Sequence, residues 1–321
     1  MENFLNWQID YLLMLQNFRE ATNGILNPFF MFITTLGEFI FPTMLAAIIY
    51  WCINNRWGMY IFWNWSIGQF VCQFLKSLAC IYRPWVLDSR IIPIDGAIKM
   101  AGGYSFPSGH TQAAVGIWGA MAVCFKNKFI TAFLIILILL IGFSRNYIGV
   151  HTPQDVIVSL FVGIVVLIFS AKLMDWVDKG KNRDIITFIG VILASIALVV
   201  YEFTKTYPLD YVNGELLVDP MKMQMYTFPK IGILIGFFTG WILNRRFIGF
   251  DAAVGSSGQK VLRGVIGLAL LSLVFEKSRI LFGFYDEPRL TMFMSAFLSS
   301  LFITGIYPAI IVYIRKKFKK L

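Results

Sequence analysis

The hydrophobic pattern of the chain consists of long apolar runs separated by short polar loops. The stretch 129–141 reads FITAFLIILILLI, and residues 156–171 contain no charged side chain. A helix needs about 20 apolar residues to cross the hydrocarbon core of a bilayer, so runs of this kind predict membrane spans. We expect nine spans, at about 27–53, 59–79, 107–125, 128–147, 152–174, 185–204, 229–244, 260–282 and 290–314.

The N-terminal segment has a different pattern. Some of its apolar residues recur every three or four positions, at Phe4, Trp7, Tyr11, Leu15 and Phe18. The polar residues lie elsewhere, at Asn6, Asp10, Asn17 and Arg19. This spacing predicts a helix with one apolar face that lies in the membrane interface rather than crossing it. The expected fold is therefore all-α, a polytopic transmembrane helix bundle of about nine spans plus this interfacial helix. We divide it into the interfacial helix (1–26), a transmembrane core (27–175) and a four-span C-terminal extension of open role (176–321).

The composition supports a membrane protein and argues against a nucleic-acid partner. Hydrophobic residues make up 58% of the 321 residues, only 14% are charged, and the mean hydropathy is +0.69. Soluble domains carry about 25% charged residues. The net charge of +10 could suggest nucleic acid. However, the basic residues cluster in short loops between apolar runs, the pattern that orients membrane proteins, so we expect no nucleic-acid binding. The four cysteines lack the spacing of a metal site.

The distribution of basic residues predicts the sidedness. In the nine-span arrangement, sixteen Lys and Arg residues fall on one side, including the C-terminal RKKFKK, and twelve fall on the other. The richer side should be cytoplasmic. The polar loops 80–106 and 205–228 would then face outward. Because the N-terminus has no basic region before an apolar run, we expect the first internal spans to direct insertion of a multi-pass protein into the cell membrane.

Candidate chemistry begins at the outward end of the second predicted span. Lys76 and Arg83 are seven residues apart, nearly two helical turns, so they share one helix face before Pro84 helps to end it. Two cations at a membrane edge can simply extend toward lipid headgroups. A fixed pair of cations is also what a phosphate dianion needs.

A second polar segment, Ser105 to His110, opens the third predicted span. Ser108 suits the start of a helix, and Gly109 lets backbone amides approach an anion closely at the positive end of the helix dipole. Capping does not explain His110, an ionisable side chain at the mouth of a membrane helix. The segment therefore suits phosphate binding.

The third segment joins the fourth and fifth predicted spans. Asp155 follows His151 by four residues, so in a helix the carboxylate can hydrogen-bond one ring nitrogen and leave the other free as a nucleophile. Asp155 could also be part of an ordinary helix start, and Arg145 could be another headgroup-facing cation. The chain has only two histidines, and each lies in one of these segments. With three cations on the same membrane face and no carboxylate cluster to hold magnesium, the pattern predicts metal-free phosphoryl transfer.

The three segments resemble the signature of the type 2 phosphatidic acid phosphatase superfamily, in its membrane branch. The matching pattern is Lys-x6-Arg-Pro, Pro-Ser-Gly-His and Ser-Arg-x5-His-x3-Asp, and the resemblance covers about residues 37–175. Membrane members usually have three spans before the end of the first motif, whereas here we expect two and the amphipathic helix. The vanadium haloperoxidases share the signature but are soluble, so this composition disfavours them.

The resemblance implies a role for each matching residue. It implies phosphate binding by Lys76, Arg83 and Arg145 with help from Ser108 and Gly109, nucleophilic attack by His151, orientation of His151 by Asp155, and protonation of the leaving oxygen by His110. It also implies an active site on the extracytoplasmic face and no cofactor. We therefore expect a lipid phosphatase that acts on phosphatidate, a prenyl pyrophosphate or a similar lipid.

Three alternatives remain open. The same site could transfer phosphate to an alcohol, or it could hydrolyse a soluble phosphate ester. A transporter is the alternative from another class, although the sequence lacks paired interrupted helices in two halves. The sequence leaves open the lipid and the oligomeric state.

The sidedness can be tested with single cysteines in a cysteine-free background. We expect an impermeant thiol reagent on intact cells to label Ser89→Cys but not Leu321→Cys, because the basic C-terminus should be cytoplasmic. Labelling of permeabilised cells provides the control for reactivity. The opposite pattern on intact cells would invert the topology.

Overall fold

The computed structural model describes residues 2–38, 40–212, 214–283 and 287–318. The chain forms two compact units: unit 1 comprises 1–42, 71–167 and 206–223, and unit 2 comprises 43–70, 168–205 and 224–321. Helices α3, α4, α9 and α11 each have residues in both units. Each unit is described by itself below.

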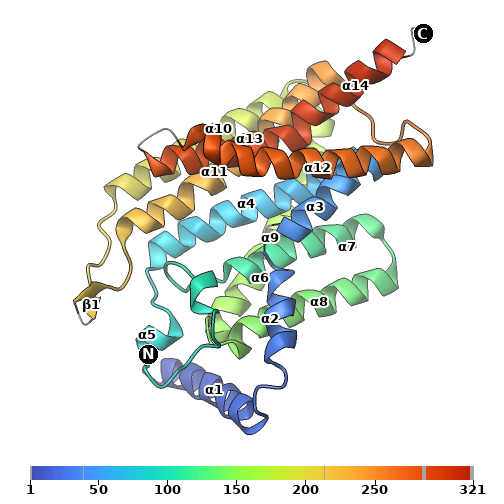
Figure 1. The fold of residues 1–321 in the computed structure, drawn as a ribbon. Helices are drawn as coiled ribbons and strands as arrows, with labels where there is room; N and C mark the ends of the chain where they lie inside the picture. Colours follow the sequence, from blue (N-terminus) through green and yellow to red (C-terminus); the bar gives the residue numbers. More distant parts are fainter. Residues whose placement is uncertain (1, 39, 213, 284–286, 319–321) are drawn as a thin grey trace. The chain divides into compact units, whose positions relative to one another are not determined.

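Unit 1 is made of helices and one small hairpin (Figure 1). Its elements are α1 (Glu2–Ala21), α2 (Asn27–Thr35), the end of α4 (Asn55–Ala79), α5 (Pro84–Leu87), the 3-10 turn η2 (Ile98–Met100), α6 (Gly109–Ala114), the π-helical turn η3 (Val115–Gly119), α7 (Ala120–Phe125), α8 (Lys128–Tyr147), the first part of α9 (Pro153–Asp178), and the strands β1 (Tyr211–Val212) and β2 (Glu215–Leu216).

Local sequence sets the turn between α7 and α8. Lys126 adopts a left-handed conformation (φ 50°), which ends α7. Asn127 then caps α8, because its side-chain oxygen accepts hydrogen bonds from the backbone amides of Phe129 (3.0 Å) and Ile130 (3.2 Å). The two helices consequently lie side by side, and the far end of α8 carries Arg145.

The hydrophobic core of unit 1 lies directly beside the candidate site. Phe30 of α2 packs against Tyr147 with ring centroids 4.2 Å apart, and Ile148 is fully buried in the same cluster. The carbonyl of Ile148 accepts a hydrogen bond from the amide of Ile94 (3.1 Å). Gly149 has a φ of +81°, and a Cβ there would lie 3.1 Å from Cα of Pro93, so glycine is required for this close approach. The loop before His151 is therefore held from two sides.

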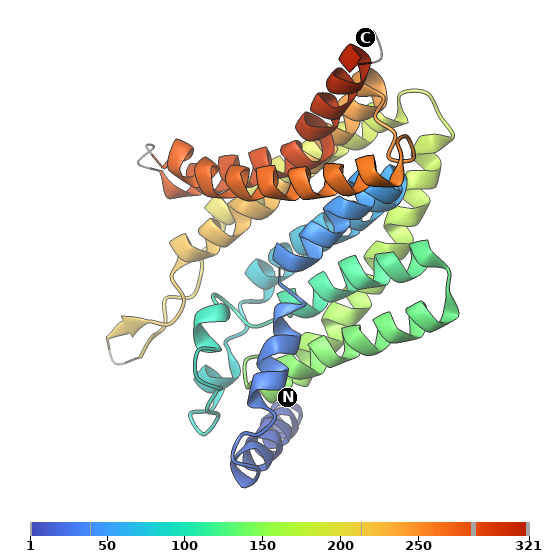
Figure 2. The same ribbon diagram turned by 45° about the vertical axis from the view of Figure 1, so that its right-hand side comes forward.

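The hairpin segment 206–223 belongs to unit 1 although it follows α10 in the chain. Tyr207 and Met223 are buried against Tyr104, and the two tyrosine rings stack with centroids 6.2 Å apart. Tyr82 donates a hydrogen bond to Asp210. Burial, and then the Asp210 carboxylate, raise the pKa of Tyr82 to about 12, so its hydroxyl remains a donor at neutral pH. Figure 2 shows the hairpin at the end of the connection between α10 and α11.

Unit 2 consists of α3 (Ile40–Ile48), the π-helical turn η1 (Ile49–Ile53), the start of α4, the end of α9, α10 (Arg183–Thr204), α11 (Pro220–Leu243), η4 (Asn244–Ile248), α12 (Ser257–Phe282), α13 (Pro288–Leu301), η5 (Phe302–Ile306) and α14 (Tyr307–Phe318). Helices α12 and α13 run side by side (Figure 2). Along α11, Gly232, Gly236 and Gly240 are spaced four apart, and a Cβ at the first two would collide with backbone carbonyls of α13. This small-residue stripe brings the two helix backbones into close contact.

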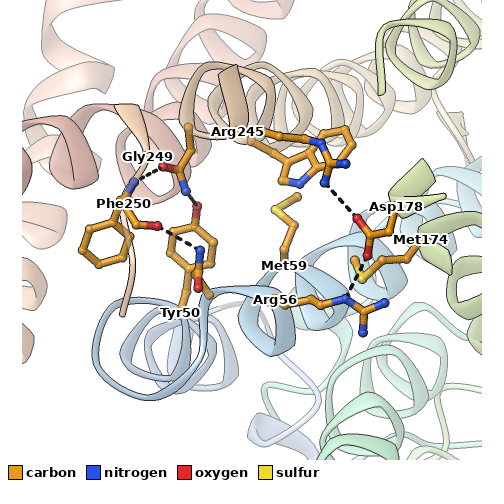
Figure 3. Close-up of a pocket in the computed structure, with 11 residues that line it drawn as sticks. Tyr50, Arg56, Met59, Met174, Asp178, Arg245, Gly249 and Phe250 are labelled. Carbon is orange, nitrogen blue, oxygen red and sulfur yellow. Dashed lines mark hydrogen bonds and ion pairs between the residues drawn. The ribbon is translucent and has the colours of Figure 1, made fainter. Parts of the chain in front are cut away.

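A cavity of about 320 Å³ lies within unit 2 (Figure 3). Asp178 accepts hydrogen bonds from Arg56 Nε (3.0 Å) and Arg245 Nη1 (2.8 Å), and Figure 3 shows its carboxylate between the two arginines. On the other side of the cavity, Asn244 donates to the hydroxyl of Tyr50 (2.9 Å). These polar side chains around the cavity are therefore hydrogen-bonded to one another, as in a structural ion-pair network.

Five helical stretches in the described part of the chain are long and apolar enough to cross a membrane: Lys128–Tyr147, Pro153–Asp178, Arg183–Thr204, Pro220–Ile248 and Pro288–Lys317. The bent pair Asn27–Thr35 and Ile40–Ile53 could form a sixth. The predicted spans 59–79, 107–125 and 260–282 are largely helical, but they do not meet the same length and apolarity. The reason is visible in α4, where Asn64, Gln73 and Lys76 are polar yet buried. Nine spans therefore remain a prediction.

The exposed faces of these helices are apolar. Phe133 of α8, Phe161 of α9 and Leu193 of α10 are each more than 60% exposed. Contiguous apolar surface of this kind requires a nonpolar surrounding, so the chain is a multi-pass membrane protein. The N-terminal segment forms helix α1, and its location in the interface remains a prediction. Residues 319–321 of the basic tail lie outside the described residues.

Candidate active site

The three polar segments singled out in the sequence come together in unit 1. The end of α4 carries the first cation, the start of α6 carries the Ser-Gly-His segment, and the connection from α8 to α9 carries the third segment. The predicted residues so placed are Lys76, Arg83, Ser108, Gly109, His110, Arg145, His151 and Asp155. Direct contacts link the first and third segments, because Arg83 reaches His151.

His151 lies between an arginine and a carboxylate, and these neighbours define its tautomer. Arg83 Nη1 is 2.9 Å from Nε2 of His151. A guanidinium group can only donate, so Nε2 must be the unprotonated nitrogen with a lone pair. Nδ1 then carries the proton, and it donates to Oδ2 of Asp155 at 3.1 Å. The predicted free nitrogen is therefore Nε2, and in this structure it accepts a hydrogen bond from Arg83.

Asp155 is held rigidly by donors from three directions. Its Oδ2 accepts hydrogen bonds from His151 Nδ1, from the hydroxyl of Ser105 (2.5 Å) and from the backbone amide of Thr152 (2.9 Å). His151 and Asp155 are both almost completely buried, with 2% and 1% of their side chains exposed. The orientation predicted from their spacing of four residues is thus present, with Ser105 as an additional partner.

Burial also determines the charge of His151, which lies in the loop between α8 and α9. Burial lowers the pKa of His151 well below its ordinary value, and the positive charges of Arg83, Arg145 and Lys76 lower it further. The ring is therefore neutral at physiological pH, which is the state with an available lone pair at Nε2.

Arg145 has donors that the protein leaves unpaired. The residue is fully buried, and its Nη1 donates to the hydroxyl of Thr34 at 2.5 Å. Its Nε and Nη2 have no hydrogen-bond partner in the described part of the chain. A buried charged donor without a partner is costly, so these two nitrogens can readily donate hydrogen bonds to the oxygens of a bound anion. Carboxylate and phosphate oxygens are the acceptors that match the planar guanidinium.

Lys76 and Arg83 make extensive contacts with backbone carbonyls. Lys76 Nζ donates to the carbonyls of Tyr104 (2.7 Å), Ser105 (3.0 Å) and Pro107 (3.0 Å). Arg83 donates to the carbonyls of Gly102 (2.9 Å) and Gly103 (3.1 Å). These two cations therefore shape the segment 102–107, and phosphate binding by them remains a prediction.

The start of α6 has the geometry of a helix cap. Ser108 Oγ accepts hydrogen bonds from the amide (3.4 Å) and hydroxyl (2.9 Å) of Thr111, and Gly109 is the first helical residue. The amide of Ser108 donates to the backbone carbonyl of Asp155 (3.1 Å), which joins α6 to α9. The serine hydroxyl thus acts as the N-cap, and assistance to phosphate remains a prediction.

His110 follows in the first turn of α6. Its side chain is 19% exposed, and its Nε2 has no hydrogen-bond partner among the described residues. The nearest carboxylate oxygen is Oε1 of Glu38, 4.0 Å away. A ring nitrogen placed in this way can exchange a proton with a ligand.

Sequence reasoning missed three residues of the site. Ser105 opens the second polar segment, but the sequence pattern assigns it no role; its position next to the Pro-Ser-Gly-His motif is the signal that could identify it. Thr34 and Glu38 both lie within the predicted span 27–53. A carboxylate inside an apolar span is a sign of function in itself, so Glu38 was detectable.

Two family models match this chain. The model described as "PAP2 superfamily" matches residues 57–179, and the model described as "PAP2 superfamily phosphatase, transmembrane extension" matches residues 228–318. The first range contains all eight predicted site residues. No solved structure matches the chain at a significant level.

Several curated proteins are similar to this chain. Undecaprenyl-diphosphatase BcrC of Bacillus subtilis is 33% identical over 148 residues, which cover 45% of this chain and 72% of that protein. A lipid A 4'-phosphatase of Bacteroides thetaiotaomicron is 24% identical over 44% of this chain and 68% of that protein. Lipid phosphate phosphatase delta of Arabidopsis thaliana is 22% identical over 53% of this chain and 44% of that protein.

These matches confirm the resemblance that the three segments carry. The geometry around His151 and the two matched ranges lead to the same conclusion. The chain belongs to the PAP2 superfamily of phosphatases and carries the transmembrane extension of that superfamily.

Proposed function

We propose that this protein is a lipid phosphatase that removes a terminal phosphate from a lipid phosphate or pyrophosphate through a phosphohistidine at His151, without a metal ion. The observation that carries the proposal is the tautomer of His151. Its Nδ1 proton is fixed on Asp155, and the lone pair of its Nε2 is directed at Arg83, a residue that can bind phosphate. When phosphate binds, the guanidinium can donate to a phosphate oxygen and release Nε2 for attack on phosphorus.

The reaction would proceed in two balanced steps. In the first, His151 Nε2 forms a bond to phosphorus while the bond from phosphorus to the lipid oxygen breaks, and His110 gives its proton to that oxygen. In the second, a water oxygen bonds to phosphorus while the phosphorus–nitrogen bond breaks, and His110 accepts a proton from the water. Arg145 would stabilise the developing negative charge with its unpaired donors.

Cationic side chains would stabilise the negative charge of the phosphate, a role that metal ions have in other phosphatases. Among the described residues, no three His, Cys, Asp or Glu side chains form a group that could hold a metal ion. Lys76, Arg83 and Arg145 supply positive charge at the same place. The relatives support a lipid substrate, because each is named as a phosphatase or diphosphatase of a lipid. The charge bias between the loops supports an extracytoplasmic site.

The proposed function can be tested on purified protein in detergent. We expect phosphate release from phosphatidate, a prenyl pyrophosphate or a sphingoid phosphate to persist in EDTA and to be inhibited by vanadate, because a cationic site fits a trigonal-bipyramidal phosphate analogue. Glycerol phosphate, which has the same phosphate without a lipid, is the control substrate. Complete loss of turnover in EDTA with recovery on adding magnesium would contradict the metal-free mechanism.

The two histidines should respond differently to the leaving group. His151→Ala should abolish turnover of every substrate, because it removes the nucleophile. His110→Ala should reduce kcat/KM on a lipid phosphate by about 100- to 10,000-fold, the usual range for general acid catalysis. It should affect nitrophenyl phosphate much less, because nitrophenolate leaves without a proton. Equal losses for His110→Ala on both substrates would refute its assignment as the acid.

Ser105→Ala tests the support of the nucleophile. One hydrogen bond to a charged group contributes about 1.5–3 kcal/mol, so we expect kcat to fall roughly 10- to 100-fold. The loss should be equal on the lipid and on nitrophenyl phosphate, because Ser105 acts through Asp155 rather than through the leaving group. Ser66→Ala is the matched control, since Ser66 is equally buried but donates to the carbonyl of Phe62 in its own helix. A loss confined to the lipid substrate would place Ser105 elsewhere in the mechanism.

A further inference from the structure

Glu38 lies beside the candidate acid although it belongs to neither matched range of the family models. It lies in the turn that follows α2, whereas His110 lies in α6. Oε1 of Glu38 is 4.0 Å from Nε2 of His110, and this ring nitrogen has no hydrogen-bond partner among the described residues. The glutamate side chain is 38% exposed and the histidine side chain 19% exposed. The pair therefore lies at the edge of the site, between its buried residues and the surface of the protein.

Contacts on the preceding residues fix the position of Glu38. Thr34 accepts the hydrogen bond from Arg145, and the indole nitrogen of Trp118 donates to the carbonyl of Leu36 at 3.0 Å. Gly37 lies so close to α6 that a Cβ would be 3.0 Å from the carbonyl oxygen of His110. The same Cβ would be 2.8 Å from Ile141 of α8. The loop is therefore packed onto three elements of the site, and its next side chain is Glu38.

The surroundings of His110 explain why a carboxylate is needed there. A general acid must be protonated before the leaving group departs. The other titratable groups that face the ring are Arg145 from α8, Arg83 from the loop after α4, and His151. Burial of the ring, and then the positive charges of the two arginines, disfavour a positive charge on the imidazole. Asp155 is committed to His151, so it cannot offset this repulsion.

The carboxylate of Glu38 is suited to this task because it is itself charged. Its contact with His110, 4.0 Å away, favours the ionised form of Glu38. The positive charge of Arg145 acts in the same direction. Glu38 therefore remains ionised at neutral pH and can stabilise an imidazolium.

We propose that Glu38 is a positioning residue for proton transfer, which orients His110 and favours its protonated form, both for departure of the lipid oxygen and when the ring takes a proton from water. This inference rests on the proposed function, and it adds a residue from outside the three signature segments. Glu38 gains and loses no proton in either step. It acts through the charge and orientation of His110.

The test is the pH dependence of kcat/KM for Glu38→Gln on a lipid phosphate and on nitrophenyl phosphate. Without the carboxylate, His110 loses its proton at lower pH, so the falling alkaline limb of the lipid profile should move down by about one pH unit. At neutral pH the lipid reaction should slow roughly tenfold, the order expected for one partly screened charge at this distance. Nitrophenyl phosphate should be affected much less, because its leaving group needs no proton.

Two further variants make the result specific. Glu38→Asp keeps the charge and should restore the alkaline limb toward that of the unmodified protein, and it also serves if Glu38→Gln does not accumulate in folded form. Glu20→Gln is the matched control. It also removes a carboxylate of unit 1, but Glu20 belongs to α1 and accepts its hydrogen bond from Gln16 of the same helix. Thermal melting should show equal stability for all variants used.

The outcomes separate the two proposals. An unmoved alkaline limb in Glu38→Gln, or equal losses on both substrates, would overturn the role of Glu38 while His151→Ala remained inactive. An alkaline limb in Glu38→Asp that is displaced as far as in Glu38→Gln would also overturn it, because charge would then not be the cause. Turnover by His151→Ala would instead overturn the proposed function.

Discussion

The hydrogen bond between Arg83 and His151 is the interaction on which the rest of the site depends. It joins the segment after α4 to the connection between α8 and α9, and it determines which ring nitrogen carries the lone pair. If Nε2 were protonated, the guanidinium would meet a donor, and the buried pair would repel. The same arginine also binds the carbonyls of Gly102 and Gly103. One side chain thus contacts both His151 and the loop that leads to Ser105.

The buried positive charges of the site differ in how the protein satisfies them. Lys76 and Arg83 donate to a ring of backbone carbonyls, which lowers the cost of burying them without a counter-ion. Arg145 has one hydroxyl partner, Thr34, and keeps two nitrogens unpaired. Lys76 and Arg83 therefore hold the backbone of residues 102–107 in place around the site. Arg145 keeps the greatest unused capacity to hold an anion.

Sequence reasoning succeeded where chemistry and helical spacing coincide. The predicted span 128–147 matches α8, and the spacing of His151 and Asp155 gave their hydrogen bond correctly. The predicted span 229–244 began too late, because α11 starts at Pro220 and continues through Pro229 as an internal residue. A proline usually marks a boundary, but here the packing of the helix overrides this tendency.

The missed partners have a common physical reason. All three contact the signature residues from far away in the chain. Ser105 lies 46 positions from His151, Glu38 lies 72 positions from His110, and Thr34 lies 111 positions from Arg145. Neither hydropathy nor periodicity records which loops meet in space. A pattern of residue types identifies candidates for the reacting groups. The groups that hold them depend on the tertiary fold.

The hairpin segment 206–223 has a consequence for the modularity of the chain. It is encoded between the two ranges matched by the family models, yet Tyr207 packs on Tyr104, whose carbonyl receives the hydrogen bond of Lys76. A gene fragment cut at residue 179 would keep every signature residue and lose this aromatic cover. The segment with the signature residues therefore cannot be exchanged independently of the hairpin. A chimera between relatives must exchange the hairpin together with the loop that it covers.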